Sequence, residues 1–86
     1  RVRSRAALER RARLDGVVLA LPSRMLFYGR RLFMNGEAVT PGKAAARALA
    51  RLADARELRA PLELDDEAWA QLYEWYLAGY IEFGER

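Results

Sequence analysis

Side chains that could carry out catalysis are almost absent from this sequence. It contains no His and no Cys, the residues that most often bind transition metals or serve as base and nucleophile near neutral pH. The acidic run at residues 65–67 and the pair Glu82 and Glu85 lack the alternating oxygen ligands and the glycine of a calcium-binding loop. Ser and Thr hydroxyls have no imidazole beside them to activate them. We therefore predict no catalytic residue, no metal ligand and no cofactor-binding residue in this chain.

Charged side chains are divided unevenly along the chain. Residues 1–59 carry 14 basic and 5 acidic side chains, a net charge of +9, whereas residues 60–86 carry one basic and 7 acidic side chains, a net charge of −6. The two halves either face one another after folding or leave the basic half open to an anionic partner. The sequence alone does not decide between these alternatives.

Arginines are the first group of candidate binding residues. Arg10 and Arg11 lie in an arginine-rich N-terminal segment, and Arg30 and Arg31 lie at a turn. Such clusters can contact phosphates. For the N-terminal segment we favour the other interpretation, in which its arginines are solvated or pair with the acidic half or with another domain, because charge runs on helices are usually solvated faces.

Aromatic residues near the C-terminus are the second group of candidates. Trp69, Tyr73 and Tyr76 follow the i, i+4, i+7 spacing of a buried helix face, so core packing explains them better than a stacking platform. Trp75 falls off that face. Because an exposed indole often marks a contact surface, we predict that Trp75 contacts another domain or protomer.

The overall composition is that of one small packed domain. The chain has 86 residues, of which 52% are hydrophobic and 10% aromatic, which is too apolar for a disordered tail. Zero cysteines fit a reducing compartment, and we expect a cytoplasmic protein. No apolar run approaches the roughly 20 residues of a membrane span. The chain begins with Arg1 rather than Met, and we expect it to be part of a longer protein.

The first half of the chain predicts a helix followed by short strands. Residues 1–16 read as a basic linker helix that begins at Arg1 and is ended by Gly16, and residues 17–86 as a separate domain. Asn35-Gly36 is the strongest hairpin-turn signal in the chain. Alternation on either side of it predicts one buried and one half-exposed sheet face. The expected strands are a first one at 17–21 and a meander at 24–28, 31–34 and 37–39.

The second half predicts two helices and a final strand. Thr40 is expected to cap the second helix with Pro41 at its first position, and Asp65 or Asp66 to cap the third. Gly79 is expected to end the third helix before a strand at 80–83. Arg47 and Arg51 lie off the apolar face of the second helix. The predicted buried faces are Ala45, Ala48, Leu49 and Leu52 in the second helix and Trp69, Leu72, Tyr73 and Tyr76 in the third.

These elements, in the order helix, strand, three-stranded meander, helix, helix, strand, predict a small α+β domain that is winged-helix-like. A winged helix invites the interpretation that its last helix enters a DNA groove. Here that helix carries only acidic charges at residues 65–67 and at Glu74, the wrong sign for phosphate. Direct groove binding is therefore disfavoured.

Three segments of the sequence resemble a known family. They are Leu21-Pro22-Ser23-Arg24, the stretch YGRRLFMNGE at residues 28–37, and LAGYIEF at residues 77–83. Together with a helix after Pro41, they are similar to the C-terminal domain of bacterial cupin/JmjC-type oxygenases of the ribosomal-protein arginine hydroxylase family. The resemblance implies Fe(II)- and 2-oxoglutarate-dependent hydroxylation of a ribosomal protein. It also implies an N-terminal cupin barrel with a His-x-Asp…His iron triad, a helical dimerisation region and a closing winged-helix domain.

Without any His, the iron triad has no counterpart here and no catalytic residue carries over. The resemblance places Fe(II) and 2-oxoglutarate in a cupin domain outside this chain. We therefore expect a non-catalytic accessory domain that packs on its enzyme's cupin and dimerisation domains or shapes access of a ribosomal protein. One alternative is a free-standing nucleic-acid-binding module that uses the first helix and the Arg30-Arg31 turn. Another is a protein-interaction module that uses Trp75.

Overall fold

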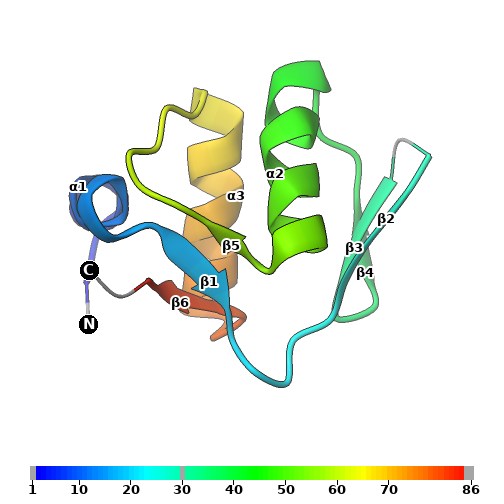
Figure 1. The fold of residues 1–86 in the computed structure, drawn as a ribbon, viewed down its shortest axis with the longest axis horizontal. Helices are drawn as coiled ribbons and strands as arrows, with labels where there is room; N and C mark the ends of the chain where they lie inside the picture. Colours follow the sequence, from blue (N-terminus) through cyan, green and yellow to red (C-terminus); the bar gives the residue numbers. More distant parts are fainter. Residues whose placement is uncertain (1, 30, 85–86) are drawn as a thin grey trace.

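The computed structural model describes residues 2–29 and 31–84, which form three helices and two small antiparallel sheets. The predicted α+β class and order of elements are confirmed, with one added strand. The elements in chain order are α1 (Arg5–Asp15), β1 (Val17–Leu19), β2 (Met25–Tyr28), β3 (Arg31–Met34), β4 (Glu37–Val39), α2 (Lys43–Ala55), β5 (Glu57–Leu58), α3 (Asp66–Leu77) and β6 (Ile81–Phe83) (Figure 1).

Local signals fix both ends of α1. The helix begins at Arg5, not at the first residue as predicted, because Ser4 caps it: the Ser4 hydroxyl accepts the Ala7 N–H at 3.1 Å. Gly16 ends the helix as predicted. Its φ of 75° is open to glycine at little cost, and its N–H donates to the Ala12 carbonyl at 2.7 Å.

The first helix shares the core of the rest of the chain. Leu8 and Ala12 are fully buried and belong to the same hydrophobic cluster as α2 and α3. The Gly84 N–H donates to the Gly16 carbonyl at 3.0 Å, so the end of α1 is tied to the strand that closes the chain. The division of the chain at residue 16 stays a prediction, while the packing joins its two sides.

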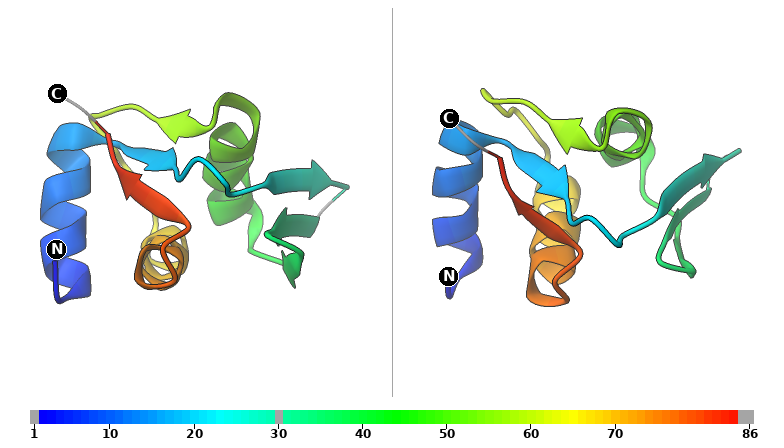
Figure 2. Two further views of the ribbon diagram at one scale, coloured as in Figure 1. Left: turned by 90° about the horizontal axis from the view of Figure 1, so that it is seen from below. Right: turned by 60° about the horizontal axis from the view of Figure 1, so that its bottom comes forward.

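The first sheet lies among the helices and has the order β5-β1-β6 (Figure 2). In its register Val17 faces Leu58 on one side and Phe83 on the other. The first strand ends at Leu19, earlier than predicted, and Leu21 beyond it is 93% exposed. Strand β5 was not predicted, because two residues carry no periodic pattern and become a strand only by pairing with β1.

The second sheet has the order β2-β3-β4 and projects from the other side of α2 (Figure 2). We call this sheet the wing. Its register places Met25 opposite Met34 and Leu32 opposite Val39. The β3–β4 turn forms as predicted, with φ of 51° at Asn35 and 87° at Gly36, the left-handed pair of a type I′ turn. The predicted meander is therefore confirmed.

Helix α2 starts later than predicted. Gly42 occupies the cap position, so Thr40 is not the cap and Pro41 is not the first helical residue. The Gly42 N–H instead donates to the Glu67 carboxylate of α3 at 3.0 Å. This tertiary contact satisfies the Gly42 N–H at the start of the helix. The sequence near Thr40 gives no sign of the contact. The buried face is as predicted and comprises Ala45, Ala48, Leu49 and Leu52.

Helix α3 is capped as predicted but buries a different arc. Asp65 accepts the Ala68 N–H at 2.9 Å, and Gly79, with a φ of 83°, follows the helix as predicted. Tyr73 and Tyr76 are only partly buried, contrary to prediction. The four residues that fill the core are Ala68, Trp69, Leu72 and Trp75.

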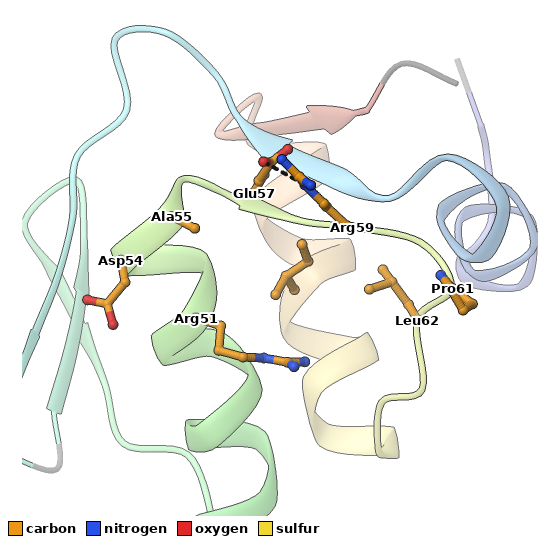
Figure 3. A pocket seen from close by; sticks show the side chains of 8 residues that line it. Arg51, Asp54, Ala55, Glu57, Arg59, Pro61 and Leu62 are labelled. Carbon is orange, nitrogen blue, oxygen red and sulfur yellow. Dashed lines mark hydrogen bonds and ion pairs between the residues drawn. The ribbon is translucent and has the colours of Figure 1, made fainter.

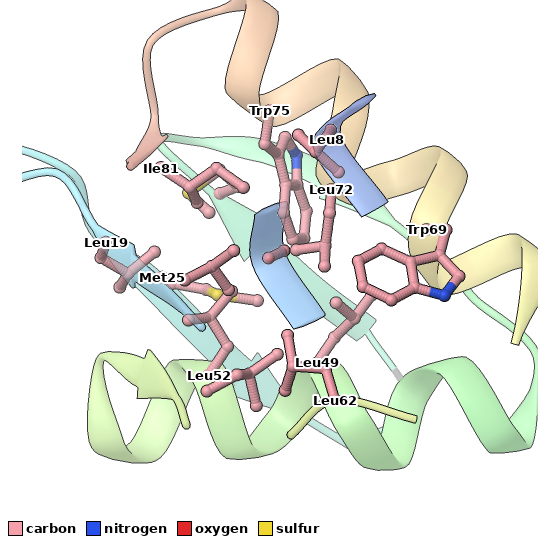
Figure 4. Close-up of a cluster of buried hydrophobic side chains, with 14 of the residues drawn as sticks. Leu8, Leu19, Met25, Leu49, Leu52, Leu62, Trp69, Leu72, Trp75 and Ile81 are labelled. Carbon is pink, nitrogen blue, oxygen red and sulfur yellow. The ribbon is translucent and has the colours of Figure 1, made fainter. Parts of the chain in front are cut away.

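Trp75 is 5% exposed and lies in the hydrophobic cluster with Leu8, Leu72 and Ile81 (Figure 4). The prediction that it is exposed is wrong. Ala68, Leu72 and Trp75 repeat at the same i, i+4, i+7 spacing as the predicted buried face. Since α3 contacts α1, α2 and β6, it buries a wide arc that includes this second stripe.

Candidate interaction surface

The predicted interface residues do not form one site. Trp75 is enclosed in the core, so its assignment to a contact surface loses its basis. Arg30 lies outside the described residues. Arg31 is exposed at the start of β3, in the wing, whereas Arg10 and Arg11 are exposed on α1, at the opposite end of the molecule (Figure 1). Arg11 pairs with its neighbour Asp15 at 3.3 Å.

Several α1 arginines are engaged by the rest of the domain. Arg5 pairs with Glu9 on its own helix and with Asp66 at the start of α3, and the hydrogen bond to the Asp66 carboxylate is the main cause that raises the pKa of Arg5. The Arg11 guanidinium lies 4.3 Å from the Phe83 ring centroid, and that of Arg13 lies 5.4 Å from the Trp69 ring. Basic and acidic halves of the chain therefore meet at this end.

The wing exposes apolar side chains on the face turned away from the core. Pleating sends Met25, Leu32 and Met34 inward, where they are buried. Leu26 and Tyr28 point the other way and are 65% and 82% exposed. We call this side the outer face of the wing. Its apolar members are Leu26, Tyr28, Phe33 and Ala38, with Leu26 opposite Phe33 and Phe33 opposite Ala38 in the register. The exposed Arg31 lies on the same face, opposite Tyr28.

A second feature is the groove between the wing and α2. It has a volume of about 520 Å³ and is lined by Phe27, Pro41, Lys43, Ala46, Arg47 and Ala50, among others. Phe27 is 43% exposed although its strand neighbour Met25 is buried. Lys43 and Arg47 are exposed and make no ion pair within the part of the chain that the structure describes.

A third feature is a hollow of about 470 Å³ at the other end of α2, beside β5 (Figure 3). It is lined by both signs of charge, from Arg51, Asp54, Glu57 and Arg59. Glu57 and Arg59 pair with each other at 3.1 Å. The lining charges offset one another, so this hollow has no clear preference for a ligand of either charge. Its lining residues include no nucleophile with a base beside it, so it offers no catalysis.

Metal binding finds no support in the described residues. Among residues 2–29 and 31–84, no group of three or more His, Cys, Asp or Glu side chains is arranged to hold a metal ion. None of the helices in this part of the chain has the length and apolarity needed to cross a bilayer.

The fold agrees with comparison to known families. The sequence model of the ROXA-like winged helix matches residues 3–82, from just before α1 into β6. The chain belongs to the ROXA-like winged helix family. This membership confirms the predicted winged-helix fold class. It also confirms the resemblance of the sequence to the C-terminal winged-helix domain of cupin/JmjC-type oxygenases. Comparison with curated proteins gave no match, and comparison with solved structures gave none.

Sequence reasoning missed the groove of this ROXA-like domain, although two of its signals were present. Alternation in β2 separated Leu26 and Tyr28 from Phe27, but it did not say which set faces the core. Arg47 and Arg51 were assigned to a face away from the buried one, but only the fold brings that helix beside Phe27. The groove depends on a contact between segments that are about 20 residues apart in sequence.

Proposed function

We propose that this domain is a non-catalytic accessory domain of an Fe(II)- and 2-oxoglutarate-dependent ribosomal-protein hydroxylase, and that it packs on that enzyme through the outer face of the wing. Membership of the ROXA-like winged helix family supports the kind of enzyme. In this proposal Fe(II) and 2-oxoglutarate bind in the enzyme's cupin domain, and the winged helix supplies surface and shape.

The observation that carries the proposal is the exposure of the outer face. In the described part of the chain no element lies over it (Figure 2), and Leu26 and Tyr28 are largely in water. Burying a large apolar side chain contributes roughly 1.5–3 kcal/mol. A rigid partner surface that covers this face would recover that free energy, which is what docking on a neighbouring domain does. A docked wing can also narrow the path of a protein substrate to the cupin site.

The nucleic-acid-binding alternative gains less support from the same structure. That alternative relied on the arginines of α1 and on the Arg30-Arg31 turn. Arg31 is exposed, but Arg5, Arg11 and Arg13 of α1 are engaged with carboxylates or aromatic rings. A phosphate would have to compete with those partners.

The test uses the intact hydroxylase with single substitutions in this domain. Leu26→Asp places a charge on the outer face, and Leu14→Asp is the matched control, because Leu14 on α1 is 66% exposed against 65% for Leu26. We expect Leu26→Asp to loosen the domain, seen as faster proteolysis of its junction and slower hydroxylation of the ribosomal protein, and Leu14→Asp to leave both unchanged. Equal effects of the two substitutions would refute docking through the wing.

The isolated chain tests the other half of the proposal. Purified residues 1–86 with Fe(II) are expected to turn over no 2-oxoglutarate. Any turnover that a point mutation inside the chain abolishes would show that the domain is itself catalytic.

A further inference from the structure

We propose that the groove between β2 and α2 binds an extended acidic segment of a partner protein, which adds to the wing as a fourth strand. Such binding is distinct from docking on the parent enzyme, because it uses the inner side of the wing rather than the outer face. Three features of the groove carry it: a free strand edge, an apolar floor and a pair of cations.

The strand edge is that of β2. The wing has the order β2-β3-β4, so one side of β2 has no strand partner among the described residues. The Asn35 N–H donates to the Arg24 carbonyl at 2.8 Å, and the Arg24 N–H donates to the Asn35 side-chain oxygen at 2.7 Å, so the backbone groups of Arg24 point toward the end of β3. Along an antiparallel strand, residues whose backbone groups point toward the partner strand alternate with residues whose groups point away from it. The backbone groups of Met25 and Phe27 therefore point away from β3, toward the free edge.

This edge lacks the usual protection against pairing. Residues 25–28 are Met, Leu, Phe and Tyr, with no charge or proline among them. Natural proteins usually protect such an edge with charged residues, proline or a covering element. An unprotected apolar edge beside a helix is the arrangement by which some domains take up an extended peptide through main-chain hydrogen bonds.

The floor of the groove suits an aliphatic side chain. Phe27, which is 43% exposed, forms the side of this floor on the wing. Ala46 and Ala50 form the side on α2, and their small side chains leave the space between helix and strand open. In an added strand every second side chain points to the same face. A peptide paired with β2 would thus place alternate side chains against this floor.

The cations of α2 set the charge of the ligand. Lys43 and Arg47 line the groove, lie one helical turn apart and are both exposed. No ion pair links either of them to another described residue. Four helical residues span about 6 Å, and two residues of an extended strand span about 7 Å. Two carboxylates two residues apart on a peptide can therefore reach both cations.

The same features favour a peptide over a nucleic acid. The backbone N–H of Gly42, at the start of α2, already donates to Glu67, so an anion must be held mainly by the lysine and arginine side chains. The edge of β2 offers alternating donors and acceptors at the peptide repeat, which a sugar–phosphate chain does not match. The apolar floor of the groove also favours a peptide, because it can bury an aliphatic side chain.

The probe is a fluorescein-labelled heptapeptide of Thr with Glu at its fourth and sixth positions and Leu at its second. Its binding to the 86-residue chain is measured by fluorescence anisotropy. Arg47→Glu is expected to weaken binding by about tenfold, as for a close charge pair turned repulsive. The matched control is Arg10→Glu, which makes the same charge change on the exposed surface of α1 and is expected to change affinity less than about twofold.

Two further arms test the floor and the strand pairing. Ala46→Phe fills the groove without changing charge and is expected to abolish binding, and circular dichroism checks that each variant is folded. Hydrogen exchange of the Phe27 amide is expected to slow at least about tenfold when the peptide is bound, since a strand hydrogen bond would protect it.

The inference would be overturned by no binding of the Glu peptide, by equal binding of a peptide with Lys in place of Glu, by equal losses from Arg47→Glu and Arg10→Glu, or by binding without protection of Phe27. Displacement of the peptide by a single-stranded oligonucleotide at lower concentration than by unlabelled peptide would also overturn it, in favour of a nucleic-acid ligand.

Discussion

This domain has two three-stranded antiparallel sheets of similar size, and they differ in how much of their surface is buried. In the β5-β1-β6 sheet the central strand is enclosed, with Val17 and Leu19 buried among α1, α2 and α3. In the wing only the inner face is covered, and Leu26 and Tyr28 remain in water. The first sheet completes the core, whereas the second presents an apolar surface.

Charge follows the same division. Near the core sheet, Arg5, Arg11 and Arg13 pair with carboxylates or lie over aromatic rings. On α2, Lys43 and Arg47 have no ion pair among the described residues. The helical end thus engages several of its own charged side chains, and the wing end leaves both apolar and charged groups exposed. Changes at the helical end should therefore alter stability, and changes at the wing end should alter binding.

The largest contrast is expected between two aromatic residues. Trp75→Ala removes a buried indole and should lower the free energy of unfolding by about 3–5 kcal/mol. Tyr28→Ala removes a ring that is mostly exposed and should change it by less than about 0.5 kcal/mol. Urea denaturation of both variants measures the difference. Similar values for the two would mean that Trp75 is not a core residue.

A smaller contrast is expected between two glycines. Gly16 has φ 75° and ψ −176°, a region that is essentially restricted to glycine, and an added Cβ would overlap the Leu58 carbonyl oxygen of β5. Gly16→Ala should destabilise the fold by about 2–4 kcal/mol. Gly36 also has positive φ but open space around it, so Gly36→Ala should cost only about 1–2 kcal/mol. Thermal melts would contradict the packing if the order were reversed.

The sequence predicted what local chemistry determines. The turn at Asn35-Gly36, the stop at Gly16, the cap at Asp65 and the buried face of α2 all formed as predicted. Each of these features depends on residues that are close to one another in the sequence. The alternation of side chains in β2 and β3 also separated the two faces of the wing. The sequence therefore indicated which residues share a face of the candidate surface.

Features that depend on distant contacts were missed. Strand β5 exists only through its pairing with β1, and α2 begins where Glu67 of α3 binds Gly42. Trp75 lies on one of two equally spaced stripes, and only the packing of α3 against three neighbours selects it. The groove likewise required the position of α2 beside Phe27. Local pattern cannot supply such information.

A further test concerns the cap of α3, at the helical end. Asp65→Ala removes the acceptor of the Ala68 N–H and should lower stability by about 1 kcal/mol. Asp65→Asn keeps a side-chain acceptor and should recover most of that loss. Chemical denaturation distinguishes the two. If Asn is no better than Ala, the hydrogen bond is not what the carboxylate contributes.

The smallest expected effect concerns a side-chain hydrogen bond that joins the two regions. Tyr80, just before β6, donates its phenol to Glu37 of β4 at 3.1 Å. This bond to the carboxylate raises the pKa of Tyr80 above its ordinary value of 10.0. A raised phenol pKa means that the folded state favours the protonated form, so its contribution is present below pH 10 and is lost as pH rises through the folded-state pKa. Glu37→Gln should lower the pKa of Tyr80, measured by NMR titration of the ring carbons, and an unchanged pKa would mean that the bond does not form in solution.

The most direct test of the division between the two ends is hydrogen exchange along the chain, free and in the presence of the proposed parent hydroxylase from which this domain has been removed. The account predicts that binding slows exchange in the wing, residues 25–39, and leaves α1 unchanged. Protection confined to α1, or no protection anywhere, would contradict the claim that the wing is the surface through which this domain acts.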